Sequence, residues 1–230
     1  MIRYLLLLLL VGALFAGMST AWSQENAGKA NQDAGDIFTP KDKDPEQKEE
    51  EKVIFRQLPE LKLKGLLKLK GKKVLLYTGT FEPYQGLDLL VGSAPRLAKR
   101  FPDARFVLVG GTPAQVRQFE AQATAMGVRD RFVLTGTVPA QEIPAFIELA
   151  TILLSTRREG TNTPSKIYTY LRSGKPLVAT NLETHTQVLN GDVAVLTDNT
   201  AEGFAEGIAD LLTSPERAQE IGRRAQAFAA

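Results

Sequence analysis

The chain of 230 residues contains no cysteine and one histidine, His185. Without cysteine there is no disulfide scaffold, no thiolate nucleophile and no cysteine-bound metal, and one histidine cannot form a multi-histidine metal site. Lysine and arginine (28) nearly balance aspartate and glutamate (26), so no excess of positive charge indicates binding to nucleic acid. Neither a Gly-x-Gly-x-x-Gly motif after the first predicted strand nor a Walker lysine motif is present, which disfavours a dinucleotide-dependent dehydrogenase and an ATPase.

The first 23 residues differ in composition from the rest of the chain. Arg3 precedes a long apolar run, and small residues follow at positions 19–21. This pattern is typical of a secretory signal peptide. Because no charged residue occurs between Arg3 and Glu25, a membrane anchor that is not cleaved is the alternative, and residues 1–23 would then contact the membrane.

Residues 24–69 are interpreted as a polar linker followed by a connecting arm. The first part is nearly free of apolar side chains and cannot bury enough surface to offset the entropy lost on ordering. Residues 53–69 carry leucines at irregular spacing among lysines, which indicates a short helix or arm that leads into the folded domain.

From residue 73 onward, short apolar runs alternate with amphipathic segments. Continuous apolar strands between helices are typical of a parallel sheet covered on both faces. With right-handed crossovers, the sequence predicts a doubly wound, Rossmann-like α/β domain over residues 70–230. The predicted strands are 74–77, 106–109, 132–134, 152–154, 176–179 and 193–196. The predicted helices are 87–100, 113–126, 143–150, 165–172, 201–212 and 215–229.

Glycines and hydroxyl residues stand at the ends of several predicted strands. Gly79 and Thr80 follow the first strand, Gly110 follows the second, and Thr180 follows the fifth. In a doubly wound sheet, ligands bind outside the carboxyl ends of the strands, and glycine lets the backbone approach a ligand closely. The alternative is that these are ordinary turn residues.

The segment after the fourth strand carries the most chemistry. The Glu159 carboxylate can accept hydrogen bonds from two sugar hydroxyls. The Arg157 and Arg158 guanidinium groups can neutralise the charge of a diphosphate. A helix start at Ser165, with Lys166 beside it, predicts an anion site. The alternatives are a solvated charge cluster, and a serine N-cap beside a surface lysine.

His185 follows the fifth strand at the start of a predicted helix. Its imidazole suits acid–base chemistry. A capping or packing role is the alternative.

Residues 73–229 resemble the carboxy-terminal, nucleotide-sugar-binding domain of the group 1 (family 4) GT-B glycosyltransferases. The segments that carry the resemblance are VLLYTGTFEPYQGLDLLVGSAPRL, PDARFVLVGG, RFVLTGTVPAQEIPAFIELATILLSTRREGTNTPSKIYTYLRSGKPLVAT and TAEGFAEGIADLLTSPERAQEIG. The resemblance implies one half of a GT-B architecture, a nucleotide-diphosphate sugar donor, and glycosyl transfer with retention and without a metal or other cofactor. It also implies an acceptor domain, which the leader and linker are too short to provide. The alternatives are a fragment, a gene remnant, or half of a two-chain enzyme in which a second chain supplies the acceptor domain.

Individual residues carry over from the family's motifs. Glu159 matches the glutamate that contacts the transferred sugar, and Val138 matches a segment that contacts the base. Thr169 stands where the family has a second glutamate, and Thr80 and Gln85 stand where it has a phosphate-binding arginine and lysine. With Glu159 as the catalytic residue, the predicted substrate-binding residues are Gly79, Thr80, Gly110, Val138, Arg157, Arg158, Gly160, Thr161, Asn162, Thr163, Ser165, Lys166 and Thr169.

Two further expectations concern location and class. The leader indicates a secreted or membrane-anchored chain, whereas the resemblance implies the cytoplasmic face of the membrane, where nucleotide sugars occur. The alternatives to transfer are a non-catalytic module that binds a nucleotide sugar or a protein, and a sugar-nucleotide epimerase of the same architecture.

Overall fold

The computed structural model describes residues 63–65 and 67–230. The predicted signal peptide or anchor, and nearly all of the predicted linker, therefore lie outside the described residues. Among those residues, no helix combines the length and the apolar character needed to cross a membrane.

The domain is built on a six-stranded sheet in which every neighbouring pair is parallel. The sheet order is β3-β2-β1-β4-β5-β6, so the chain winds outward in both directions from the central pair β1 and β4. The strand bounds are β1 Lys73–Thr78, β2 Ala104–Val109, β3 Phe132–Gly136, β4 Ile152–Ser155, β5 Leu177–Thr180 and β6 Val195–Thr197. This confirms the predicted doubly wound, Rossmann-like α/β fold.

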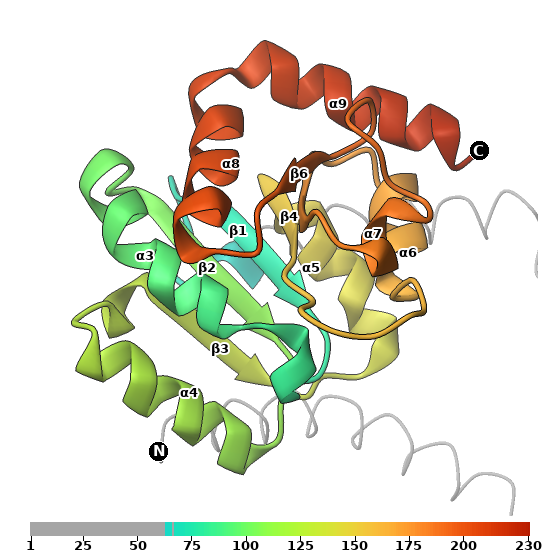
Figure 1. The fold of residues 1–230 in the computed structure, drawn as a ribbon. Helices are drawn as coiled ribbons and strands as arrows, with labels where there is room; N and C mark the ends of the chain where they lie inside the picture. The colour runs from blue at the N-terminus through green and yellow to red at the C-terminus, as the bar shows by residue number, and fades with distance from the viewer. Residues whose placement is uncertain (1–62, 66) are drawn as a thin grey trace, which may run out of the picture. The chain divides into compact units, whose positions relative to one another are not determined.

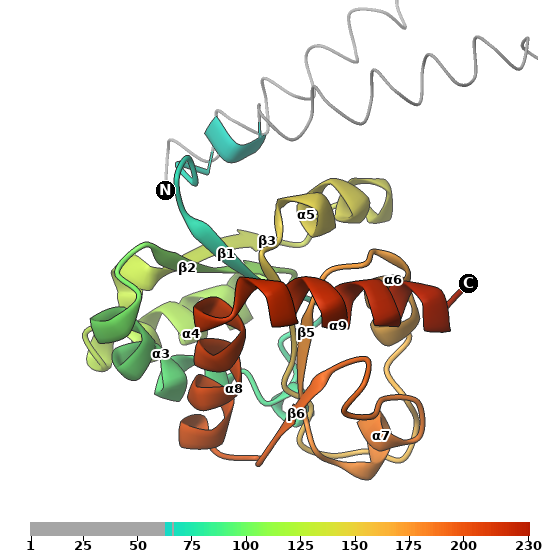
Figure 2. The same ribbon diagram turned by 90° about the horizontal axis from the view of Figure 1, so that it is seen from above.

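Helices cover both faces of the sheet (Figure 1). Figure 2 shows α5 on one side, and α3, α4 and α8 on the other. The α-helices are α3 Asp88–Arg100, α4 Pro113–Ala125, α5 Ile143–Leu149, α6 Lys166–Arg172, α7 Glu183–Thr186, α8 Ala201–Thr213 and α9 Pro215–Phe228. Short 3-10 helices occupy η1 Pro83–Gln85, η2 Arg129–Arg131 and η3 Ala140–Glu142.

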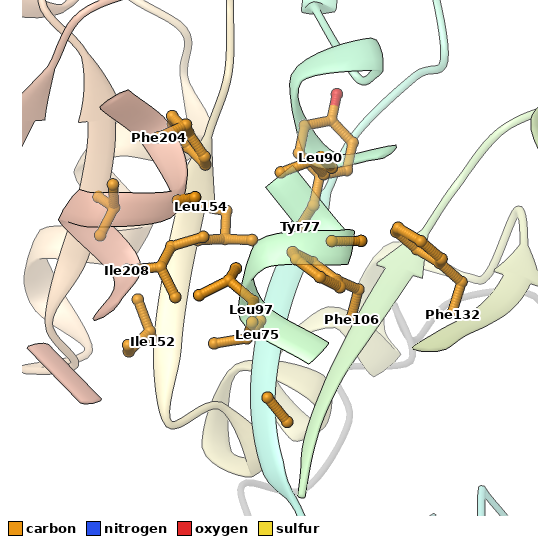
Figure 3. Close-up of a cluster of buried hydrophobic side chains, with 14 of the residues drawn as sticks. Leu75, Tyr77, Leu90, Leu97, Phe106, Phe132, Ile152, Leu154, Phe204 and Ile208 are labelled. Atoms are coloured by element: carbon orange, nitrogen blue, oxygen red, sulfur yellow. The ribbon is translucent and has the colours of Figure 1, made fainter. Parts of the chain in front are cut away.

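Successive residues of each central strand point to opposite faces, which divides the core into two clusters. Leu75 and Tyr77 pack with α3 and α8 in one cluster, part of which is drawn in Figure 3. Val74 and Leu76 pack with α5 and α6 in the other. Because both faces are buried, the strands are continuously apolar, which is why they were recognisable in the sequence.

The last strand differs from its prediction. The apolar run suggested residues 193–196, but β6 begins at Val195. Val193 and Ala194 are buried, yet their N–H groups donate to the carbonyl of Asn190 and so belong to a turn. Burial alone does not distinguish a strand from a tightly packed turn.

Candidate functional site

The order of the strands reverses between β1 and β4, and this is where a crevice forms in doubly wound sheets. Two loops leave the sheet at this point. The β1–η1 loop comprises residues 79–82, and the β4–α6 loop comprises residues 156–165. The β4–α6 loop contains most of the predicted site residues.

The chain after β4 is bound directly to η1. The Arg158 N–H donates to the carbonyl of Tyr84 over 2.8 Å. The hydroxyl of Thr156 donates to the carbonyl of Gln85 over 2.6 Å, in a buried position. The two segments are therefore held together by hydrogen bonds as the strands end.

Lys166, the first residue of α6, extends toward the end of β1. Its Nζ donates to the carbonyl of Thr78 over 3.1 Å and lies 3.8 Å from the centre of the Tyr77 ring. The side chain is half-buried, and in the part of the chain that the structure describes no carboxylate pairs with it. Burial, with a smaller contribution from Arg157, lowers the pKa of the Lys166 ammonium to about 7.

The two arginines of the β4–α6 loop have different surroundings. The Arg158 guanidinium forms an ion pair with Asp88 at the start of α3. Arg157 instead lies over the ring of Tyr84, 5.2 Å from its centre, and its Nε donates to the carbonyl of Glu159 over 2.7 Å. Arg157 forms no ion pair with any described residue, so its charge is available to an anion.

The middle of the loop is open to solvent. Glu159, Gly160, Thr161 and Asn162 are exposed, and the Glu159 carboxylate forms no hydrogen bond with a described residue. The acid is thus free to accept hydrogen bonds from a ligand, and the sugar contact expected from the sequence stays a prediction.

A cavity of about 220 Å³ brings four predicted residues together. Apart from Thr80 and Thr137, it is walled by glycine and aliphatic side chains, which suits a flat, largely apolar group such as a base. Gly79, Thr80, Gly110 and Val138 line it, together with Val109, Gly111, Thr137 and Ile143.

Gly110 has a backbone reason to be glycine. A Cβ at this position would lie 1.9 Å from the carbonyl oxygen of Gly79, and φ is +128°. The sequence predicted that a ligand approaches the backbone here. In the structure it is the backbone of Gly79, in the same chain, that lies close to Gly110. At Gly79, φ is +143° and a Cβ would lie 3.0 Å from the hydroxyl of Tyr77, so this position also favours glycine.

The start of α6 differs from the alternative interpretation of the sequence, a capping serine beside a surface lysine. Ser165 stands at the N-cap position of α6, but it is exposed and its side chain makes no capping hydrogen bond, so the expected side-chain cap is wrong. Lys166 is half-buried, so the surface lysine is wrong as well. The N–H of Ile167 donates to the carbonyl of Pro164, which removes one of the amides expected to face an anion. Thr169 is exposed, one turn after Lys166.

His185 lies in α7 and is completely buried, with three polar atoms of Ser155 and Thr180 within hydrogen-bond distance of its ring. Its Nδ1 is 2.9 Å from the carbonyl of Thr180, which only accepts, so Nδ1 carries the proton. Nε2 therefore accepts from the hydroxyl of Ser155 over 2.8 Å. Burial lowers the pKa of His185 to about 4. With no exposure to solvent, the imidazole serves packing, which decides between the two roles considered from the sequence.

The depressed pKa of His185 predicts acid sensitivity. Below pH 6.5 His185 is protonated in the unfolded chain, whereas in the folded chain it stays neutral down to about pH 4. The free energy of unfolding therefore decreases as the pH is lowered through this range. We expect a loss of about 2 kcal/mol between pH 7.5 and 5. Urea unfolding at the two pH values measures it. Since this is the only histidine, H185N should lose most of that pH dependence; an unchanged dependence would contradict the assignment.

Two residues of the site carried no signal in the sequence. Asp88 pairs with an arginine 70 residues away. The side chain of Gln187 donates from Nε2 to the carbonyl of Thr161 over 2.8 Å, and its Oε1 accepts from the hydroxyl of Thr163 over 3.2 Å. Both contacts depend on the folded topology, and local patterns do not reveal them.

Comparison with known proteins identifies relatives. The family model described as glycosyl transferases group 1 matches residues 60–228. The chain is 29% identical over 162 residues to the GDP-mannose-dependent alpha-(1-6)-phosphatidylinositol monomannoside mannosyltransferase of Mycolicibacterium smegmatis, a match that covers 67% of this chain and 42% of the relative. To the alpha-D-kanosaminyltransferase of Streptomyces kanamyceticus it is 27% identical over 161 residues, covering 68% and 41%. The chain thus spans less than half the length of these relatives.

Solved structures share the fold. Anabaena Alr3699/HepE in complex with UDP superposes with a TM-score of 0.67 at 21% identity, over 75% of this chain and 48% of that one. The C-terminal domain of LpcC, a glycosyl transferase group 1 family protein from Francisella tularensis, superposes with a TM-score of 0.62 at 14% identity, over 75% and 90%. These matches support the predicted single half of a GT-B architecture.

Proposed function

The chain belongs to the glycosyl transferases group 1 family, and from this premise we propose that its domain binds a nucleoside-diphosphate sugar at the crevice between β1 and β4. The diphosphate would lie against Lys166 and Arg157, and the sugar against Glu159. The base would enter the cavity that Val138 lines.

One observation carries this proposal. Lys166 holds its ammonium half-buried at the carboxyl edge of the sheet, without a carboxylate partner among the described residues. A desolvated cation of this kind is costly unless an anion completes it. Arg157 adds a second unpaired charge nearby, and a diphosphate is the ligand part that would match both. The UDP bound by the similar Alr3699/HepE structure supports the same ligand class.

Transfer of the sugar forms the second part of the proposal. The reaction would proceed with retention and without a metal, Glu159 contacting the transferred sugar. The acceptor would bind to a further half, which we propose comes from a second chain. Chelation of divalent cations by EDTA should leave donor binding unchanged.

Calorimetric titration tests the donor site. The full chain would be titrated with UDP, GDP and ADP, and then with UDP-glucose, GDP-mannose and ADP-glucose. Micromolar binding of one nucleotide and its conjugate would support the proposal. A folded protein that binds none of the six ligands would contradict it.

Replacing Glu159 should lower the affinity for the nucleotide sugar and leave the affinity for the free nucleotide nearly unchanged. We expect E159A to weaken binding of the nucleotide sugar about tenfold, because two hydrogen bonds to a charged acceptor are lost. Binding of the free nucleotide should change less than about twofold. Titration of both ligands measures the difference, with E183A, another exposed glutamate, as the control. Equal losses for both ligands would refute the sugar contact.

A second candidate function is a non-catalytic module that binds a nucleotide sugar or a protein. It is favoured by Thr169, an exposed, uncharged residue where the resemblance places a second glutamate. Donor binding without transfer or donor hydrolysis, even when an acceptor half is supplied, would favour this candidate.

A further inference from the structure

The β4–α6 loop is tied to a segment that lies beyond the next strand. Thr180, at the end of β5, donates from its hydroxyl to the carbonyl of Arg157 over 2.7 Å. Gln187, directly after α7, holds the carbonyl of Thr161 and the hydroxyl of Thr163 with the two ends of its amide. Glu159 lies between these attachment points in the chain.

The segment that provides these ties is itself firmly held. His185 is buried and bonded to both Ser155 and Thr180, so α7 is fixed to the ends of β4 and β5. The N–H of Gln187 donates to the carbonyl of Glu183, which continues the helical turn. Gln187 therefore connects an exposed loop to a rigid base.

We propose that Gln187 is the positioning residue of the β4–α6 loop: it fixes residues 159–163 and thereby sets the affinity for the sugar part of the donor. The ligand part of this statement rests on the proposed function. Gln187 itself would touch neither the sugar nor the diphosphate.

The bonding pattern of Gln187 explains why an amide is required. The carbonyl of Thr161 needs a donor, and the Thr163 hydroxyl uses an acceptor. A glutamate in this place would keep the acceptor but turn an oxygen toward the Thr161 carbonyl, which has no proton to give. Q187E should therefore fail much as Q187A does, although it preserves size.

Gln187 is exposed, so its replacement leaves the core intact. Hydrogen exchange of the full chain, read by mass spectrometry, measures the loop directly. We expect Q187A and Q187E to raise deuterium uptake in peptides over residues 158–165 and to leave peptides from β4 and β5 unchanged. T186A, at the exposed neighbouring position, is the matched control and should behave like the unmodified chain. Unchanged uptake in the loop would overturn the proposal.

Binding gives the second readout. With UDP and UDP-glucose as probes, and the GDP and ADP pairs used if UDP does not bind, we expect Q187A to lose about fivefold in affinity for the conjugate and less than about twofold for the nucleotide. Equal losses, or no loss beside a loosened loop, would overturn the role in sugar binding. Failure of the unmodified chain to bind any nucleotide would refute the proposed function, while hydrogen exchange would still decide whether Gln187 fixes the loop.

Discussion

Replacing Lys166 by methionine is expected to weaken nucleoside-diphosphate binding about 30-fold to 100-fold, because a charge-assisted contact to a diphosphate in a partly desolvated site is lost. Methionine keeps the length and apolar body of the side chain, so the core beneath α6 stays filled. Calorimetry with UDP, followed by GDP and ADP, measures the change. The stability of the fold should change little, because the variant removes a half-buried charge and, with it, one hydrogen bond to the carbonyl of Thr78.

The affinity of this site for a diphosphate should also depend on pH, through the protonation of Lys166. Since burial lowers the pKa of Lys166 to about 7, a growing share of the free protein loses this charge above neutral pH. Binding of the diphosphate requires the proton to return, so affinity should fall by up to about tenfold per pH unit between pH 7 and 9. The direction for stability is opposite: the unfolded chain holds the proton to a higher pH, so folding is favoured as pH rises through this window.

Arginine at position 166 provides the matched control. K166R stays protonated throughout this range and should bind with little pH dependence, whereas K166M should bind weakly at every pH. If the nucleotide affinity of the unmodified protein does not change from pH 7 to 9, Lys166 does not bind the diphosphate. Normal binding by K166M would lead to the same conclusion.

The second large effect concerns the backbone beneath the cavity. G110A is expected to destabilise the domain by about 3 kcal/mol or more, because its methyl group would meet the Gly79 carbonyl and its φ of +128° suits only glycine. Chemical denaturation measures the loss. Nucleotide binding should fall as well, since separation of the β1 and β2 ends would displace the residues that line the cavity.

G127A separates the two causes. Gly127 also has a positive φ, +68°, but a Cβ there would meet nothing within 4 Å. Its replacement should therefore cost only about 1 kcal/mol, the conformational part. Similar losses for G110A and G127A would show that the contact with Gly79 contributes little.

The sequence predicted the sheet and the edge at which polar residues gather, because both follow from local patterns. Strands buried on both faces are continuous apolar runs, and the carboxyl ends of parallel strands share one edge. All six strands were placed within about two residues of their ends. The start of β6 was missed by two residues, because Val193 is buried in a turn that periodicity does not resolve.

Local patterns did not predict how charges are paired within the site. Arg157 and Arg158 are adjacent and identical in type, yet only Arg158 finds a carboxylate, from Asp88 at the start of α3. Lys166 looked like a surface residue because its partners, Tyr77 and the carbonyl of Thr78, lie 88 residues or more before it in the chain. These roles come from three-dimensional neighbours.

The central pairing of β1 with β4 also has a kinetic meaning. The N–H of Val74 donates to the hydroxyl of Thr151, 77 residues further along, and β1 and β4 are the two strands between which the strand order reverses. Contacts between residues so far apart in the chain form late in folding, because closing the long loop between them costs conformational entropy. As a nascent chain emerges, the half-sheet β3-β2-β1 therefore precedes any ability to hold a ligand. The chain becomes able to bind a ligand only when its carboxy-terminal third has packed against this half-sheet.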